Sequence, residues 1–199
     1  MPSEQMRSTD LTATHQSVLL LVRAALFAAL TAAGALLAIP LPISPVPITL
    51  QLVFTLMAGM LLGARYGAFS QLVYVLMGVI GLPVFAKGSA GLGILLGPTG
   101  GYLIGFIAAA AVTGAIAAGV RRFTQVRYWR LFGYILAAFL GVAIMYTLGT
   151  WRLGVMLQVN AVKAVALGVV PFILPDLLKL VAAAALVVAL EERGVSSAM

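Results

Sequence analysis

The chain has 199 residues, of which 63% are hydrophobic and only 9% are charged, and its net charge is +7. Soluble domains carry about 25% charged residues, so this composition and the mean hydropathy of +1.14 exclude a water-soluble globule and indicate an integral membrane protein. There is no cysteine, and the one histidine, His15, lies in a polar N-terminal segment. Disulfide and thiolate chemistry are therefore excluded, and a histidine-based metal site is disfavoured.

Six apolar runs follow a polar N-terminal segment. Residues 1–17 lack the basic-then-apolar build of a signal peptide and predict a cytoplasmic tail, poorly ordered or forming a short surface helix. The runs that predict membrane-spanning helices are 18–39, 48–63, 66–82, 99–119, 131–150 and 171–190. The expected fold is an all-α integral membrane protein, a single six-transmembrane-helix bundle over 18–192 with a C-terminal tail over 193–199.

Three of the predicted loops share one side of this bundle. The loop 40–47 holds four prolines in eight residues, which exclude a helix and favour an extended, stiff connection. The loop 83–98 is rich in glycine. The segment 151–170 is too polar for a spanning helix and predicts a loop with an interfacial or half-buried helix.

The basic residues set the expected orientation. Eight of them lie on the side of the two termini and three lie in the loops of the opposite side. Because cytoplasmic segments carry the excess of Lys and Arg, both termini are expected in the cytoplasm and the three loops outside. The positive charge thus indicates topology rather than nucleic acid binding.

The strongest candidate site is a pair of charges at the start of the last apolar run. Asp176 and Lys179 are three residues apart, so a helix places them on one face near its outer end. Ionisable groups within a membrane span are costly and mark a ligand, ion or proton site by default. A carboxylate with an ammonium can bind a neutral group that has both N–H donors and a carbonyl, such as a urea or an amide. The alternatives are a self-neutralising structural ion pair or a lysine that reaches toward the interface.

Further polar candidates surround the outer loops. Glycines such as Gly91 and Gly93 let backbone N–H groups approach a ligand, although a plain flexible turn is the alternative. Gln51 and Tyr102 lie beside the loops, where each can serve either as a helix–helix hydrogen bond or, together with Thr49, as a ligand contact.

The first apolar run also has a stripe of small residues. Ala24, Ala28 and Ala32 recur at four-residue spacing, with Ala25, Ala29 and Ala33 beside them. Such a smooth face allows another helix to approach closely, either in a partner protein or within the bundle itself.

Four separated motifs together resemble the BioY family, the biotin-binding S components of energy-coupling factor (ECF) transporters. The motifs are Pro45–Gln51, Gly81–Phe85, Gly91–Tyr102 and Pro171–Lys179. The resemblance implies a multi-pass protein of the bacterial cytoplasmic membrane that captures biotin on the outer side. It also implies partners, namely a transmembrane coupling (T) protein and cytoplasmic ATPases, since this chain has no Walker motif.

Roles carried over from the family complete the expected site. Asp176 and Lys179 would hold the ureido group of biotin, the glycine loop would close over the ligand, and Lys87 would meet its carboxylate. The face of Ala24, Ala28 and Ala32 would dock on the coupling protein. No cofactor, metal or catalytic residue is expected. The alternatives are an S component for another vitamin, a membrane-embedded enzyme that uses Asp176, and a structural membrane subunit.

Overall fold

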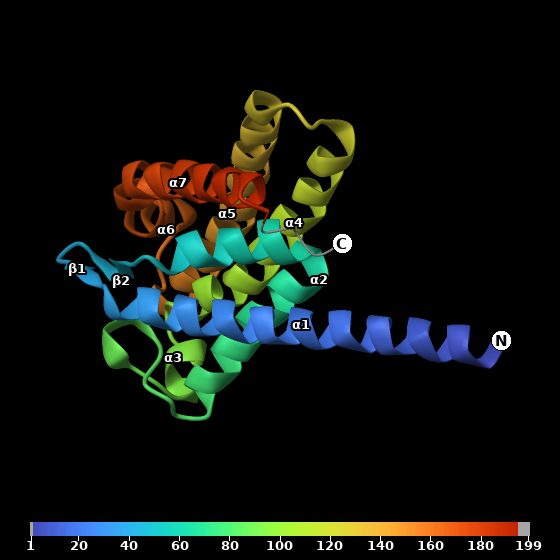
Figure 1. The fold of residues 1–199 in the computed structure, drawn as a ribbon. Coiled ribbons are helices and arrows are strands. Elements are labelled where there is room, and N and C mark those ends of the chain that lie inside the picture. The colour runs from blue at the N-terminus through green and yellow to red at the C-terminus, as the bar shows by residue number, and fades with distance from the viewer. Residues whose placement is uncertain (1, 195–199) are drawn as a thin grey trace.

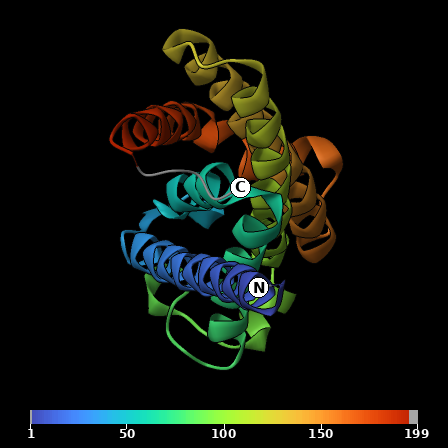
Figure 2. The same cartoon turned by 45° about the vertical axis from the view of Figure 1, so that its right-hand side comes forward.

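Helices make up nearly all of the structure, a computed structural model that describes residues 2–194, with side chains from residue 16 onward (Figure 1). The helices and strands are α1 (Pro2–Leu36), β1 (Ile39–Leu41), β2 (Ser44–Ile48), α2 (Gln51–Val79), α3 (Leu92–Leu96), α4 (Gly100–Phe123), α5 (Arg127–Leu157), α6 (Ala161–Gly168) and α7 (Ile173–Glu192). Two short 3-10 turns, Ala86–Gly88 and Val170–Phe172, complete the described chain. The helix α2 packs against α1, α4 and α7, and α4 also packs along α5 (Figure 2).

Five helical segments of the described chain are long and apolar enough to cross a membrane: Gln16–Leu36, Gln51–Val79, Gly100–Phe123, Arg127–Leu157 and Ala161–Glu192. The predicted spans 48–63 and 66–82 fall together in α2. A mostly helical membrane fold is therefore confirmed, whereas the number six and the side on which the termini lie stay predictions. The start of α1 and the end of α7 do share one side, away from the β-hairpin (Figure 1).

A break divides α2 where the second and third predicted spans meet. Gly63 has φ 76° and ψ 177°, far from helical values, and the ribbon changes direction there (Figure 1). The break removes the usual i to i−4 hydrogen bonds across it, so carbonyls before Gly63 need other donors. Arg121 of α4 supplies one, because its Nη1 donates to the Met60 carbonyl at 2.5 Å. A helix that crosses the break thus helps to hold it.

The proline loop is a β-hairpin. β1 and β2 pair antiparallel, with Ile39 opposite Ile48 and Leu41 opposite Ser44. Proline lacks the N–H that a helix requires but is tolerated in a two-stranded edge. The extended connection predicted for 40–47 is confirmed, and the all-α description needs this one exception.

Two predicted boundaries were wrong. α1 begins at Pro2 and runs without interruption into the first span, so 2–17 continue the helix instead of forming a separate tail. α5 extends to Leu157, past the predicted end at 150, because no Pro or Gly pair interrupts it; it ends where Gln158 adopts a left-handed conformation with φ 52° and ψ 42°. The predicted half-buried helix in 151–170 is present as α6.

The close approach of α4 to α2 depends on a glycine. A Cβ added to Gly114 would lie 2.5 Å from backbone atoms of Gly63 and Ala64 in the break of α2. A Cβ added to Gly119 of the same helix would meet nothing within 4 Å. We expect Gly114→Ala to destabilise the protein by about 1–3 kcal/mol through backbone displacement. Gly119→Ala, the matched control, should be neutral or stabilise by up to about 1 kcal/mol, because alanine has the higher helix propensity.

Thermal unfolding of the two purified variants in detergent measures this difference. Equal melting temperatures would show that α4 can move away from the break without cost.

Candidate functional site

A cavity of about 260 Å³ opens between the β-hairpin, the loop after α2, and the helices α4, α5 and α7. This volume is slightly below the range of about 300–1,000 Å³ typical of small-molecule sites. Its apolar wall includes Val46, Leu52, Phe85, Leu103, Phe106 and Met145. Its polar groups are Thr49, Gln51, Lys87, Ser89, Thr99, Tyr102, Tyr146, Asp176 and Lys179. The cavity therefore combines a mostly apolar surface with a few converging donors and acceptors, as binding sites for small organic molecules do.

The predicted charge pair lies in the wall of this cavity. Lys179 Nζ donates to Asp176 Oδ1 at 2.7 Å, and the two side chains are 11% and 8% exposed, respectively. Asp176 occupies the first turn of α7, where the helix dipole favours a negative charge. The pair combines burial, opposite charge and access to the cavity, which are the features that the sequence predicted.

The pair keeps hydrogen-bonding capacity for a ligand. An ammonium has three N–H donors, and in the described part of the chain only one of those of Lys179 is used, on Asp176. Each Asp176 oxygen accepts one bond, from Lys179 or from Tyr146, and retains a further lone pair. A ligand that presents one carbonyl and neighbouring N–H groups can therefore bind both partners without breaking the pair.

Tyr146 is a site residue that the sequence did not identify. It lies in α5, where its hydroxyl donates to Asp176 Oδ2 at 2.7 Å and its ring lines the cavity. In the sequence it stands in an apolar run, 30 positions from Asp176. A hydroxyl inside a span was the only signal available, and that signal does not reveal its partner. Tyr146 orients the carboxylate from the neighbouring helix.

We expect Tyr146→Phe to weaken ligand binding by about tenfold, because a hydrogen bond to a charged group contributes roughly 1.5–3 kcal/mol. The ring and its packing remain in this variant, so only the donor to Asp176 is lost. Equilibrium titration of the purified protein with ligand measures the change. Tyr128→Phe is the matched control, since that tyrosine is 68% exposed and lies outside the cavity. Equal affinity in both variants would contradict a positioning role for Tyr146.

Gln51 and Thr49 belong to a hydrogen-bonded chain at the cavity wall. Thr49 Oγ1 donates to Gln51 Oε1 at 2.9 Å, and Gln51 Nε2 donates to the hydroxyl of Tyr74. Tyr74 in turn donates to the Val84 carbonyl at 3.2 Å. The chain connects the end of the β-hairpin to the loop after α2. Both predicted residues line the cavity, and their polar groups also hold its two mobile walls together.

Tyr102 also has a structural bond at the cavity. Its hydroxyl donates to the Gly168 carbonyl at 2.8 Å and so connects α4 to the end of α6. Its ring fills the space beside Gly149, where an added Cβ would lie 2.4 Å from ring atoms. Both readings offered by the sequence therefore apply, since the same side chain lines the cavity and joins two helices.

The glycine loop contributes different residues from those predicted. Lys87 lines the cavity, is exposed, and has a positive φ of 61°. Gly91 and Gly93 are not among the lining residues. Gly91 instead has φ 96° and precedes the first turn of α3, a conformation that glycine adopts without strain. In this structure the two glycines shape the loop, and Phe85, Ser89 and Ile94 are the residues that face the cavity.

The predicted docking face on α1 also needs correction. Ala24 and Ala28 are 0% and 1% exposed, so they pack inside the protein, and Ala32 is half-buried. Ala25, Ala29 and Ala33 are exposed along the other side of the helix. Residue spacing alone could not distinguish these two rows, which are offset by a single position.

Comparisons with known proteins agree with this geometry. A family model described as the BioY family matches residues 5–195. The biotin transporter BioY of Thermotoga maritima is 41% identical over 172 residues, which is 86% of this chain and 95% of that protein. The biotin transporter BioY of Rhizobium etli is 40% identical over 168 residues, covering 83% and 89%. A crystal structure of the S-component for biotin from an ECF-type ABC transporter matches with TM-score 0.79 and 29% identity, covering 89% of this chain and 93% of that one.

Proposed function

Since the chain belongs to the BioY family, we propose that it captures biotin in the cavity beside Asp176 and Lys179 for uptake across the membrane, as the substrate-binding subunit of an ECF-type transporter. The observation that carries the proposal is the buried pair of these residues, whose free donors and acceptors face a mostly apolar cavity. This arrangement fits a fused, largely apolar bicycle with one urea group.

The ureido group would bind at the pair. Its carbonyl oxygen accepts a hydrogen bond from Lys179, and its N–H groups donate to the oxygens of Asp176 that Tyr146 holds in place. The sulfur-containing ring and the aliphatic tail would lie against Leu52 and Phe106. Lys87, at the wall of the cavity, is the proposed partner of the tail carboxylate. Charge-assisted bonds at both ends would select biotin over ligands that lack either group.

The membrane placement and the partners follow from the same proposal. The excess of basic residues puts both termini in the bacterial cytoplasm and the cavity on the outer side. A transmembrane coupling protein and cytoplasmic ATPases would drive transport, with this chain supplying the ligand site. The exposed row of Ala25, Ala29 and Ala33 on α1 is the proposed docking face for the coupling protein.

Equilibrium binding to the purified protein tests the ligand. Isothermal titration with biotin, biotin methyl ester, thiamine and riboflavin should give tight one-to-one binding for biotin alone. The methyl ester should bind more weakly in the wild type, and this loss should disappear in Lys87→Met. Tight binding of another vitamin would identify a different S component. Binding of none of these ligands would contradict the capture of biotin.

We expect Ala29→Trp to abolish co-purification with a coupling protein while biotin binding to the isolated chain stays unchanged, because the indole would fill the smooth face of α1. Leu26→Trp is the control, since Leu26 is 56% exposed on the same helix but outside the alanine row. Pull-down from membranes that contain the partner subunits measures both variants. Normal complex formation by Ala29→Trp would show that the partner docks elsewhere.

A further inference from the structure

A second cavity lies far from the biotin site, between the end of α4 and the start of α5. It has a volume of about 590 Å³ and is open along one side. Its walls are Ile116, Gly119, Val120 and Phe123 of α4 with Trp129 and Gly133 of α5. α4 has 24 residues and is therefore about 36 Å long, so this groove lies roughly one bilayer thickness from the cavity at the other end.

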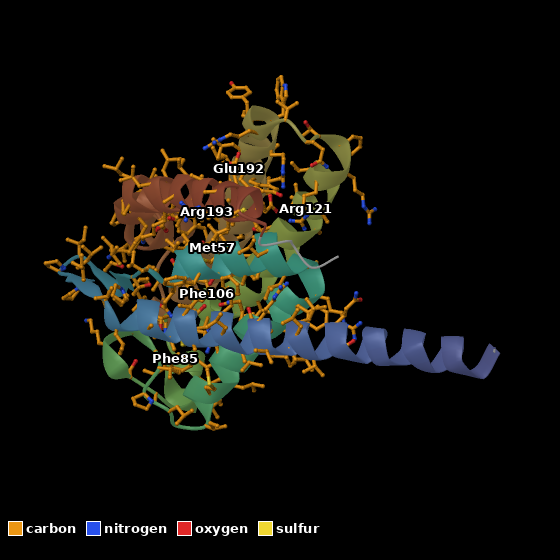
Figure 3. The ribbon with its side chains drawn as sticks, viewed as in Figure 1. Met57, Phe85, Phe106, Arg121, Glu192 and Arg193 are labelled. Atoms are coloured by element: carbon orange, nitrogen blue, oxygen red, sulfur yellow. The ribbon has the colours of Figure 1, made fainter. Side chains whose placement is uncertain are left out.

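The groove faces away from the other helices. Its α4 residues recur at three- and four-residue spacing and so share one face of that helix. Arg121 projects from another face, where it contacts Met60 and Glu191 in the interior. Figure 3 shows Arg121 beside the end of α7, near Glu192 and Arg193. The α4–α5 turn itself projects beyond α7 (Figure 1). The open side of the groove is thus directed toward lipid rather than toward the core.

Two glycines produce the shape of the groove in different ways. A Cβ on Gly133 would lie 2.7 Å from the Val120 side chain, so this glycine lets α4 and α5 touch at the base. A Cβ on Gly119 would meet nothing within 4 Å, so this glycine leaves the space open. The hollow is therefore built into the helix pair by glycines that no other side chain fills.

Charge and aromatic residues mark the rim. Arg122 is exposed and, within residues 16–194, makes no hydrogen bond or ion pair, whereas Arg127 pairs with Glu192 at 3.1 Å. Phe123 and Trp129 are 90% and 58% exposed. Exposed aromatic side chains at a helix end are typical of the membrane–water interface, and basic residues at that depth attract anionic lipid headgroups.

We propose that this groove is a binding site for one anionic phospholipid. An acyl chain lies along Ile116, Gly119 and Gly133, and the headgroup phosphate binds the unpaired guanidinium of Arg122. Acyl chains match the apolar walls, and only a negatively charged headgroup complements the free arginine and the +7 charge of the chain. The site is independent of biotin capture, because it shares no residue with the other cavity.

Native mass spectrometry of the full-length protein, titrated with phosphatidylglycerol or phosphatidylcholine, tests the proposal. We expect one phosphatidylglycerol to bind at least about fivefold more tightly than phosphatidylcholine, which corresponds to one lipid–arginine contact. Arg122→Gln should remove this preference. Gly119→Leu should weaken binding of that lipid by about tenfold or more, since the new side chain enters open space and fills the groove without displacing another helix.

Two controls separate the site from general effects. Arg65→Gln removes an exposed positive charge elsewhere, and Ala115→Leu adds the same apolar bulk at an exposed position of α4 outside the groove. Both should retain the preference for phosphatidylglycerol, and all four variants should bind biotin like the wild type. Equal affinity for the two lipids in the wild type would overturn the proposal. So would a Gly119→Leu variant that binds lipid normally but fails to join the coupling protein, because the groove would then be a protein interface.

Discussion

Asp176→Asn is expected to weaken biotin binding by at least about 100-fold. The carboxylate is buried and paired with Lys179 at 2.7 Å, so its loss leaves an ammonium without a counter-charge in the membrane-embedded wall. Removal of one partner of such a pair costs about 2–5 kcal/mol, and each 1.4 kcal/mol is tenfold in affinity. An asparagine also offers one acceptor oxygen where the ureido N–H groups and Tyr146 require two. Isothermal titration with biotin measures the change.

Lys179→Met and the double variant Asp176→Asn/Lys179→Met separate binding from stability. Lys179→Met should lose binding to a similar degree and should also lower the melting temperature, because it leaves the carboxylate alone. The double variant leaves no uncompensated buried charge, so its stability should recover while its affinity does not. Two single variants with wild-type affinity for biotin would show that the pair has only a structural role.

Glu191→Gln is the second substitution with a large expected effect, on stability rather than on binding. Glu191 is 4% exposed at the end of α7, where it contacts Arg121 of α4 at 3.4 Å and also Arg130 of α5. Tyr134 donates to both of its carboxylate oxygens, at 2.9 and 3.0 Å. The variant would leave two buried guanidinium groups without a counter-charge, at a cost of about 3–5 kcal/mol. The melting temperature should fall by roughly 10 °C.

The neighbouring residue provides a matched control for this prediction. Glu192 pairs with Arg127 at 3.1 Å, but these side chains are 40% and 71% exposed, respectively. Glu192→Gln makes the same chemical change at an exposed pair, which contributes about 0–1 kcal/mol. Thermal unfolding of both variants in the same detergent compares them directly. Equal losses would show that the Glu191 cluster is stabilised by solvent and not by its arginines.

The cluster around Glu191 also explains why α2 can be broken. Arg121, held by Glu191, donates to the Met60 carbonyl on the N-terminal side of the break at Gly63. A single ion pair therefore connects α7 and α4 to the bend of α2. The sequence showed Arg121 only as one basic residue in a topology signal, because its partners lie 61 and 70 positions away.

The spans, the proline connection and the Asp176/Lys179 pair could be predicted because each depends on residues close together in the sequence. Apolar runs of sufficient length must be helical in a membrane, and two charges three apart on a helix must meet. The helix containing Ala24 and Ala28 was predicted by the same reasoning. Its buried face was not, because adjacent rows of alanine are equivalent until another helix covers one of them.

The sequence by itself determined that this protein is a helical membrane protein of the BioY family with a charged pair for its ligand, since composition, local spacing and four motifs suffice for those conclusions. Tertiary structure alone decided that Tyr146 holds Asp176, that Gly91 and Gly93 lie outside the cavity wall, and that Glu191 balances two arginines. These features depend on contacts between distant helices. Such contacts are set by which faces pack together, and no local pattern of residues encodes that choice.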